Sequence, residues 1–113
     1  MVVTVTSIKL KSVWYFFRLS LFGYRIQKQA KLETGFITMK NTGFGYEHFT
    51  LSVWNSINDL KRFAHSGEHA LAMKSSKELS HMISTFTYET DILPGWKEAK
   101  MLLKKNGKVL NFK

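Results

Sequence analysis

Apolar and polar positions follow two periods along this chain, and the periods predict its secondary structure. Alternation with β-branched residues is typical of strands, and apolar residues every three or four positions are typical of helices. We expect strands at Val2–Leu10, Gly35–Lys40, Tyr46–Trp54 and Met82–Glu89, and helices at Val13–Lys31 and from Ile57 to Leu71. A short helix, Trp96–Lys104, and a tail or short edge strand, Lys108–Phe112, follow them. The order β-α-β-β-α-β is that of the ferredoxin-like fold.

Capping and turn residues mark the ends of these elements. Ser12 is suited to cap the first helix, and Asn55 or Ser56 the second, because their side chains accept from free helical N–H groups. The segment 41–45, Asn-Thr-Gly-Phe-Gly, is typical of a turn, since asparagine and glycine tolerate positive φ. Gly67 is expected to break or kink the second helix.

The predicted architecture leaves one face of the sheet to be covered. A four-stranded antiparallel sheet with its helices on one face exposes the other face, which needs a partner layer. At 113 residues the length indicates one domain, 1–113. We therefore expect a homodimer whose open sheet faces pack together, a dimeric α/β barrel.

The strand Tyr46–Trp54 has two chemically different faces. One is suited to packing against helices and consists of Glu47, Phe49, Leu51 and Val53. The other mixes polar and aromatic groups and consists of Tyr46, His48, Thr50, Ser52 and Trp54. A pocket is expected on this mixed face.

Charge and composition narrow the classes of partner. Lys and Arg number 17 against 8 Asp and Glu, a net charge of +9 that attracts nucleic acid, anionic lipid or acidic proteins. The charges are spread along the chain, and we interpret them as a basic surface. The basic, aromatic segment Val13–Lys31 also suits a membrane surface, although covering the sheet is the favoured interpretation. The aromatic residues of the chain lack the arrangement found on an RNA-binding sheet, so nucleic acid is not an expected partner.

Two absences exclude further classes of protein. The chain has no cysteine, which excludes disulfides and thiolate chemistry and fits a reducing compartment. No apolar run reaches the roughly 18 residues that span a bilayer. The expected location is cytoplasmic.

The segment His65-Ser66-Gly67-Glu68-His69 matches the H-x-x-E-H pattern of zinc peptidases. Gly67 weakens the helix that must hold this spacing, and a third ligand is not evident, so we predict no metal site. His69 alone, near the mouth of the expected pocket, could act as a general base or bind a haem iron. The alternative is a helix-end histidine that bonds to a backbone carbonyl.

Three stretches, 36–46, 51–56 and 63–73, resemble the spheroidene-monooxygenase-like family. The resemblance covers about residues 13–96 and extends to the dimeric α/β-barrel proteins related to antibiotic-biosynthesis monooxygenases. It consists of a glycine-rich turn, a strand ending in Trp-x-Ser, a helix with Phe-Ala, and Gly-x-His-Ala. It implies a dimeric barrel with a pocket between each sheet and its helices, in a group that includes haem enzymes and cofactor-free oxygenases. By motif position, His69, Trp54 and Phe63 match the family's histidine, strand-end tryptophan and helix aromatic.

The sequence thus favours a small monooxygenase-like oxidoreductase that binds an apolar or aromatic molecule, with haem or with no cofactor. His69 is the expected haem ligand or base. The residues expected to line or close the site are His48, Thr50, Trp54, Phe63 and Phe17. The alternatives are a non-catalytic dimeric ligand-binding protein of the same fold and, third, a basic nucleic-acid-binding module.

Overall fold

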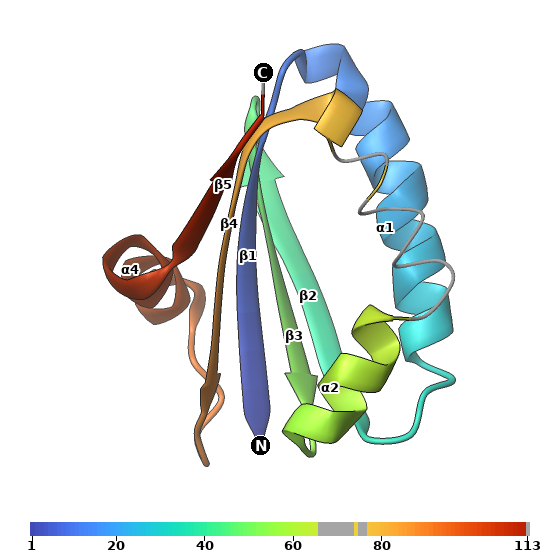
Figure 1. The fold of residues 1–113 in the computed structure, drawn as a ribbon, viewed down its shortest axis with the longest axis vertical. Coiled ribbons are helices and arrows are strands. Elements are labelled where there is room, and N and C mark those ends of the chain that lie inside the picture. Colours follow the sequence, from blue (N-terminus) through green and yellow to red (C-terminus); the bar gives the residue numbers. More distant parts are fainter. Residues whose placement is uncertain (66–73, 75–76, 113) are drawn as a thin grey trace.

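The computed structural model describes residues 1–65, 74 and 77–112 and contains one antiparallel sheet with helices on both sides (Figure 1). The strands are β1 (Val2–Leu10), β2 (Phe36–Phe44), β3 (Glu47–Trp54), β4 (Ser80–Glu89) and β5 (Lys108–Asn111). The helices are the 3-10 turn η1 (Val13–Tyr15), α1 (Phe16–Ala30), α2 (Ile57–Ala64) and α4 (Trp96–Asn106). Within the described ranges, no helix is both long and apolar enough to cross a bilayer.

The strand order β2-β3-β1-β4-β5 confirms the ferredoxin-like topology. The sheet has five strands, however, and the prediction of four is corrected. After α4 the chain turns back at Gly107, and β5 pairs antiparallel with β4 from Met82↔Asn111 to Thr85↔Lys108. The C-terminal segment is therefore an edge strand, because it lies beside backbone groups of β4 that would otherwise lack partners.

The strand β2 is longer than predicted. Asn41 and Thr42 belong to the ladder with β3, opposite Thr50 and Phe49, rather than to a turn over 41–45. The turn itself is reduced to residues 45 and 46. The physical reason is that cross-strand pairing satisfies the backbone of this segment better than a local turn would.

Both predicted caps are present. The Ser12 hydroxyl accepts a hydrogen bond from the Trp14 N–H at 3.3 Å, and the Ser56 hydroxyl accepts one from the Asp59 N–H at 3.2 Å. The helix α1 continues through Gly23 without a break. The described part of the second predicted helix ends at Ala64, and the predicted kink at Gly67 lies outside the described residues.

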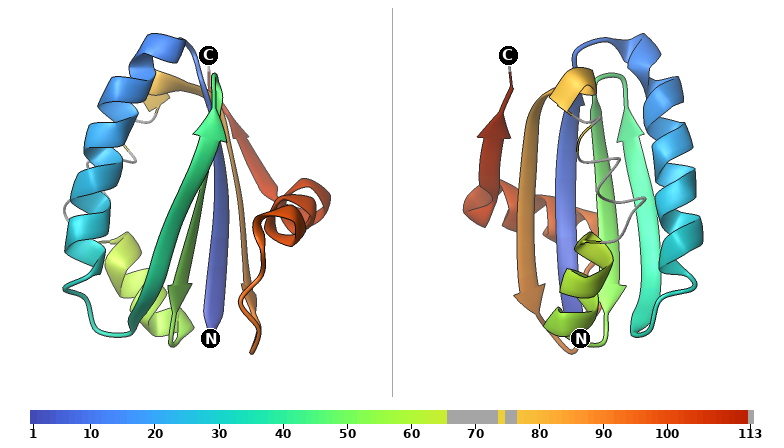
Figure 2. Two further views of the ribbon diagram at one scale, coloured as in Figure 1. Left: turned by 180° about the vertical axis from the view of Figure 1, so that it is seen from behind. Right: turned by 45° about the vertical axis from the view of Figure 1, so that its right-hand side comes forward.

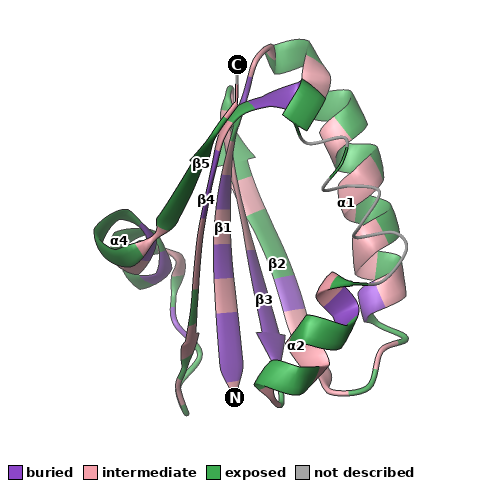
Figure 3. Ribbon diagram, in the orientation of Figure 1, coloured by how far each residue is buried: buried purple, intermediate pink, exposed green. Residues whose placement is uncertain are grey.

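The two sides of the sheet carry different cores. α1 and α2 lie on one side, and α4 packs against the opposite side, as Figures 1 and 2 show. The core beneath α4 consists of Val3, Val5, Leu51, Val53, Ala99 and Leu103. The core at the α2 end of the other side consists of Ala30, Met39, Trp54 and Phe63. Alternation along β1 and β3 explains the division, since successive side chains point to opposite faces. The buried segments are concentrated in these strands (Figure 3).

Candidate functional site

A cleft separates α1 from the face of the sheet beneath it. It consists of two adjoining cavities, an outer one of about 350 Å³ and an inner one of about 200 Å³. Both are lined by Ile8, Leu19, Gly23, Asn41 and Thr50, so the two form one continuous space. The outer cavity adds Phe16 and His48, and the inner cavity extends to α2.

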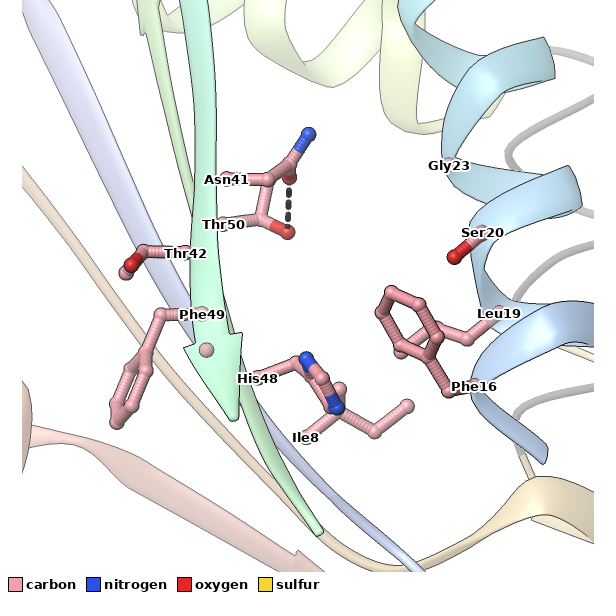
Figure 4. A pocket seen from close by; sticks show the side chains of 11 residues that line it. Ile8, Phe16, Leu19, Ser20, Gly23, Asn41, Thr42, His48, Phe49 and Thr50 are labelled. Carbon is pink, nitrogen blue, oxygen red and sulfur yellow. Dashed lines mark hydrogen bonds between the residues drawn. The ribbon is translucent and has the colours of Figure 1, made fainter. Parts of the chain in front are cut away.

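The floor of the cleft, which the strands form, combines polar side chains with the apolar Ile8, Met39 and Ile83. Strand register places Asn41, Thr50, Thr6 and Thr85 in one row across the sheet. The Thr50 hydroxyl donates to Asn41 Oδ1 at 2.9 Å, and the hydroxyls of Thr6 and Thr85 lie 3.3 Å apart. The Thr50–Asn41 bond leaves the Asn41 amide N–H groups as donors at the surface of the cleft (Figure 4).

The wall opposite this floor is apolar. It is built by the helices and by the segment before β4, from Leu19, Phe22, Ile26, Leu60, Phe63, Ala64 and Leu79. A cleft with one apolar wall and a few polar groups on the other side is typical of sites for small organic molecules. A flat apolar molecule with a hydroxyl or carbonyl edge matches this arrangement.

His48 lies at the mouth of the cleft. Its ring stacks on that of Phe16, with centroids 4.9 Å apart and planes inclined by 26° (Figure 4). Its Nε2 lies 3.0 Å from the carbonyl oxygen of Gly45. Because a carbonyl oxygen can only accept, Nε2 carries the hydrogen and donates it. In the neutral ring, Nδ1 is then the unprotonated nitrogen, and it can accept a proton.

Gly43 makes room for this histidine. Its φ is +149°, in the region that favours glycine, and a Cβ here would lie 2.6 Å from both Nδ1 and Cα of His48. The imidazole therefore lies in the space that a side chain at position 43 would need. This contact holds the ring beside β2 and toward the cleft.

The structure brings three of the predicted site residues to this cleft. His48 lines the outer cavity, Phe63 the inner one, and Thr50 both. Trp54 lies on the same strand but is fully buried, with its ring 5.5 Å from that of Phe36 and 4.9 Å from that of Phe63. Its Nε1 has no hydrogen-bond partner in the described part of the chain. Trp54 thus supports Phe63 from behind rather than lining the cavities.

The other two predicted residues are placed differently. Phe17 is 69% exposed and stacks on Trp14 with centroids 6.4 Å apart, outside the set of residues that line the cleft. His69 lies outside the described residues.

Sequence reasoning missed several lining residues, above all Phe16, Leu19 and Asn41. Phe16 and Leu19 are three positions apart on α1, a spacing that did indicate a shared helical face. Asn41 gave no usable signal, because its propensity for turns masked its place in β2.

The side chains that the structure describes determine whether a metal ion or haem fits this site. In the described ranges, no three His, Asp or Glu side chains gather closely enough to hold a metal ion. Nε2 of His48 is not free to bind a haem iron, because it donates to the Gly45 carbonyl. His65 and His81 are exposed and do not line the cleft.

Solved structures with the same fold cover most of this chain. SnoaB from Streptomyces nogalater, a cofactor-independent oxygenase, is 12% identical with a TM-score of 0.69, over 83% of this chain and 97% of its own. Rv0793 from Mycobacterium tuberculosis is 12% identical with a TM-score of 0.72, over 84% and 100%. A protein from Deinococcus radiodurans, assigned provisionally to the antibiotic biosynthesis monooxygenases, is 12% identical with a TM-score of 0.72, over 84% and 97%. At these identities the likeness shows the fold alone.

Comparison of sequences adds one family. The family described as "Domain of unknown function (DUF3291)" matches residues 20–108. No curated protein matches the chain. The matched range includes most of α1, β2 and β3, and therefore most of the residues that form the cleft.

Proposed function

The chain belongs to the DUF3291 family, and from this membership and its antibiotic-biosynthesis-monooxygenase-like fold we propose that it is a monooxygenase-like oxidoreductase acting on a small aromatic molecule. The substrate occupies the cleft between α1 and the sheet. Its ring lies against the apolar wall, and its polar edge meets Asn41 and Thr50.

The observation that carries the proposal is the position of His48. It is a base at the mouth of an otherwise mostly uncharged cleft, with its tautomer set by the Gly45 carbonyl and its ring held by Phe16. A base held in this way is positioned for proton transfer from a bound molecule. The Asn41 amide is placed to donate to an oxygen on which negative charge develops.

These groups suit an oxygenation without an added reductant. Nδ1 of His48 removes a proton from an activated CH₂ group of the substrate, and the resulting anion supplies electrons to O₂. Loss of water from the peroxide then leaves a carbonyl, so that CH₂ and O₂ become C=O and H₂O. The substrate provides all the electrons for the reduction. SnoaB is a precedent for a cofactor-independent oxygenase on this fold.

The experiment uses anthrone, a tricyclic molecule with one activated CH₂ between aromatic rings. We expect oxygen consumption and formation of anthraquinone by the wild-type protein, with a loss of at least 100-fold in His48→Gln, the scale of one general base. His65→Gln is the matched control, because His65 is exposed and lies away from the cleft. An equal rate in His48→Gln would contradict the proposal. Binding of anthrone without oxygen consumption would favour the alternative, a non-catalytic ligand-binding protein.

A more specific proposal is that the protein is a spheroidene-monooxygenase-like enzyme with His69 as haem ligand or base. The order of the family's motifs in the sequence supports it. A Soret band in protein supplied with haemin, lost in His69→Ala and retained in His48→Gln, would support it. Protein that takes up no haemin would contradict it.

A homodimer through the sheet face opposite α1 and α2 is a further proposal, and α4 already covers part of that face. It is supported by two exposed apolar side chains of the edge strand β5, Val109 and Leu110, which are 48% and 40% exposed. Sedimentation equilibrium tests it, and a monomer at micromolar concentration would exclude it.

A further inference from the structure

The helix α1 has a second apolar face, which points away from the sheet. With the turn before it, this face presents Trp14, Phe17, Leu21 and Tyr24, which are 74%, 69%, 51% and 64% exposed. Their spacing of three and four residues aligns them along one side of the helix. Figure 3 shows exposed segments along the whole of α1. We call these four side chains the outer stripe.

Large aromatic side chains in such a position need an explanation. The inner side of α1 already provides the wall of the cleft through Leu19, Phe22 and Ile26. The outer stripe therefore contributes nothing to the described core. A contiguous exposed apolar patch on a helix usually marks a surface for a partner or a membrane.

Charge on the same helix decides which partner fits. α1 contains Arg18, Arg25 and Lys28 and no acidic residue. Arg18 is 3.7 Å from Glu78, whereas Arg25 and Lys28 have no ion-pair partner in the described residues. Positive charges that flank an aromatic stripe, on a protein of net charge +9, match a surface that is apolar inside and negative outside. A second copy of this chain would instead bring positive charges against positive charges.

We propose that the outer stripe docks the protein on the surface of a membrane that contains anionic lipids. α1 lies in the plane of the interface, with Trp14 and Tyr24 at the level of the headgroups, where such rings are favoured. Arg25 and Lys28 contact lipid phosphates. The proposal does not depend on the oxygenase chemistry.

Docking in this way places the cleft next to the lipid. Phe16 at the mouth of the cleft adjoins Phe17 of the outer stripe, with ring centroids 6.3 Å apart. An apolar ligand dissolved in the membrane would then enter the cleft over a short distance. The membrane surface would be the source of the ligand as well as the site of docking.

The test measures co-sedimentation with vesicles of phosphatidylcholine alone and of an equimolar mixture with phosphatidylglycerol. We expect binding to the mixed vesicles, little to phosphatidylcholine, and strong weakening at high salt. Emission of Trp14, obtained as the difference between wild type and Trp14→Phe, should shift to the blue on binding. Equal binding to both kinds of vesicle, or no binding, would overturn the proposal.

Two pairs of variants separate the stripe and its charges from the rest of the surface. Arg25→Glu/Lys28→Glu should weaken binding at least tenfold, since each basic residue at the surface contributes about fivefold. Lys104→Glu/Lys105→Glu on α4 removes the same net charge and should weaken binding much less. Phe17→Ser/Leu21→Ser should abolish the blue shift, and Ile92→Ser/Met101→Ser, which changes exposed apolar residues elsewhere, should not. Equal effects within either pair would contradict docking through α1.

Two further measurements test whether the variants are folded and whether the protein self-associates. All four changed pairs are at exposed positions, so we expect each variant to fold as the wild type does. Circular dichroism checks this. Sedimentation velocity without vesicles tests for a second copy on the stripe. A dimer that Phe17→Ser/Leu21→Ser dissociates would assign the stripe to self-association and overturn membrane docking.

Discussion

His48 of β3 and Phe16 of α1 stack across the mouth of the cleft, with their ring centroids 4.9 Å apart. This contact joins the sheet to the helix that covers it, and both residues line the outer cavity (Figure 4). It also holds the imidazole whose Nε2 donates to the Gly45 carbonyl. One aromatic pair therefore shapes the entrance and positions the candidate base.

Replacing Phe16 should affect ligand binding, and replacing Phe17 should not. Phe16→Ala removes the stacked ring, a contact worth about 0.5–1.5 kcal/mol, so we expect anthrone to bind roughly 2- to 13-fold more weakly. Phe17→Ala, in the absence of vesicles, should change the affinity less than about twofold, since its ring lies outside the cleft. Titration calorimetry measures both. A larger loss in Phe17→Ala would instead support the predicted role of Phe17 in closing the site.

Alanine at two glycines should have opposite effects on stability. Gly43→Ala forces a strained φ and a clash with His48, and should lower the free energy of unfolding by roughly 1–3 kcal/mol. Gly23→Ala lies in α1 with no atom within 4 Å of the new Cβ, and should raise it by about 0.5–1 kcal/mol. Urea unfolding followed by circular dichroism checks the signs. Stabilisation by Gly43→Ala would show that position 43 has room for a Cβ and that His48 does not lie against it.

Trp54 should tolerate phenylalanine better than its burial suggests. Trp54→Ala should cost roughly 3–5 kcal/mol of unfolding free energy, as expected for a large buried ring. Trp54→Phe should cost well under half of this, because it also removes an N–H without a partner in the described residues, which costs about 1–3 kcal/mol. Trp96→Phe is the control, since it removes no unpaired buried N–H. Equal costs for the two Trp54 variants would indicate that Nε1 is hydrogen-bonded.

Alkaline pH should destabilise the fold through Tyr88. Burial, with a smaller contribution from Glu98, raises the pKa of the Tyr88 hydroxyl above its ordinary value of 10.0. The unfolded chain therefore loses this proton at a lower pH than the folded chain does. Stability is fully present below pH 10 and falls as the pH rises above 10. In Tyr88→Phe this part of the decline should disappear, as thermal unfolding at several pH values would show, and an unchanged decline would contradict it.

The order of elements and the topology followed from local information. Alternation in β1 and β3 and helical spacing in α1 predicted the ferredoxin-like arrangement, and Ser12 and Ser56 marked helix starts correctly. These features depend on neighbouring residues, whose preferences act over one or two turns of chain. The weaker signals failed where long-range pairing competed with them, as in the extension of β2 through Asn41. At the C-terminus the sequence left a tail and a short edge strand as alternatives, and pairing with β4 decided for the strand β5.

The candidate site, too, was predicted in part from local sequence pattern and determined in part by tertiary contacts. The alternation of β3 alone placed His48, Thr50 and Trp54 on one face, and a pocket on that face was expected. Which of these side chains reach the cleft was decided by contacts with elements distant in sequence. Phe63 of α2 covers Trp54, and Phe16 of α1 meets His48. Such contacts depend on where each helix crosses the sheet, and that position is set by the packing of the whole core rather than by any local pattern.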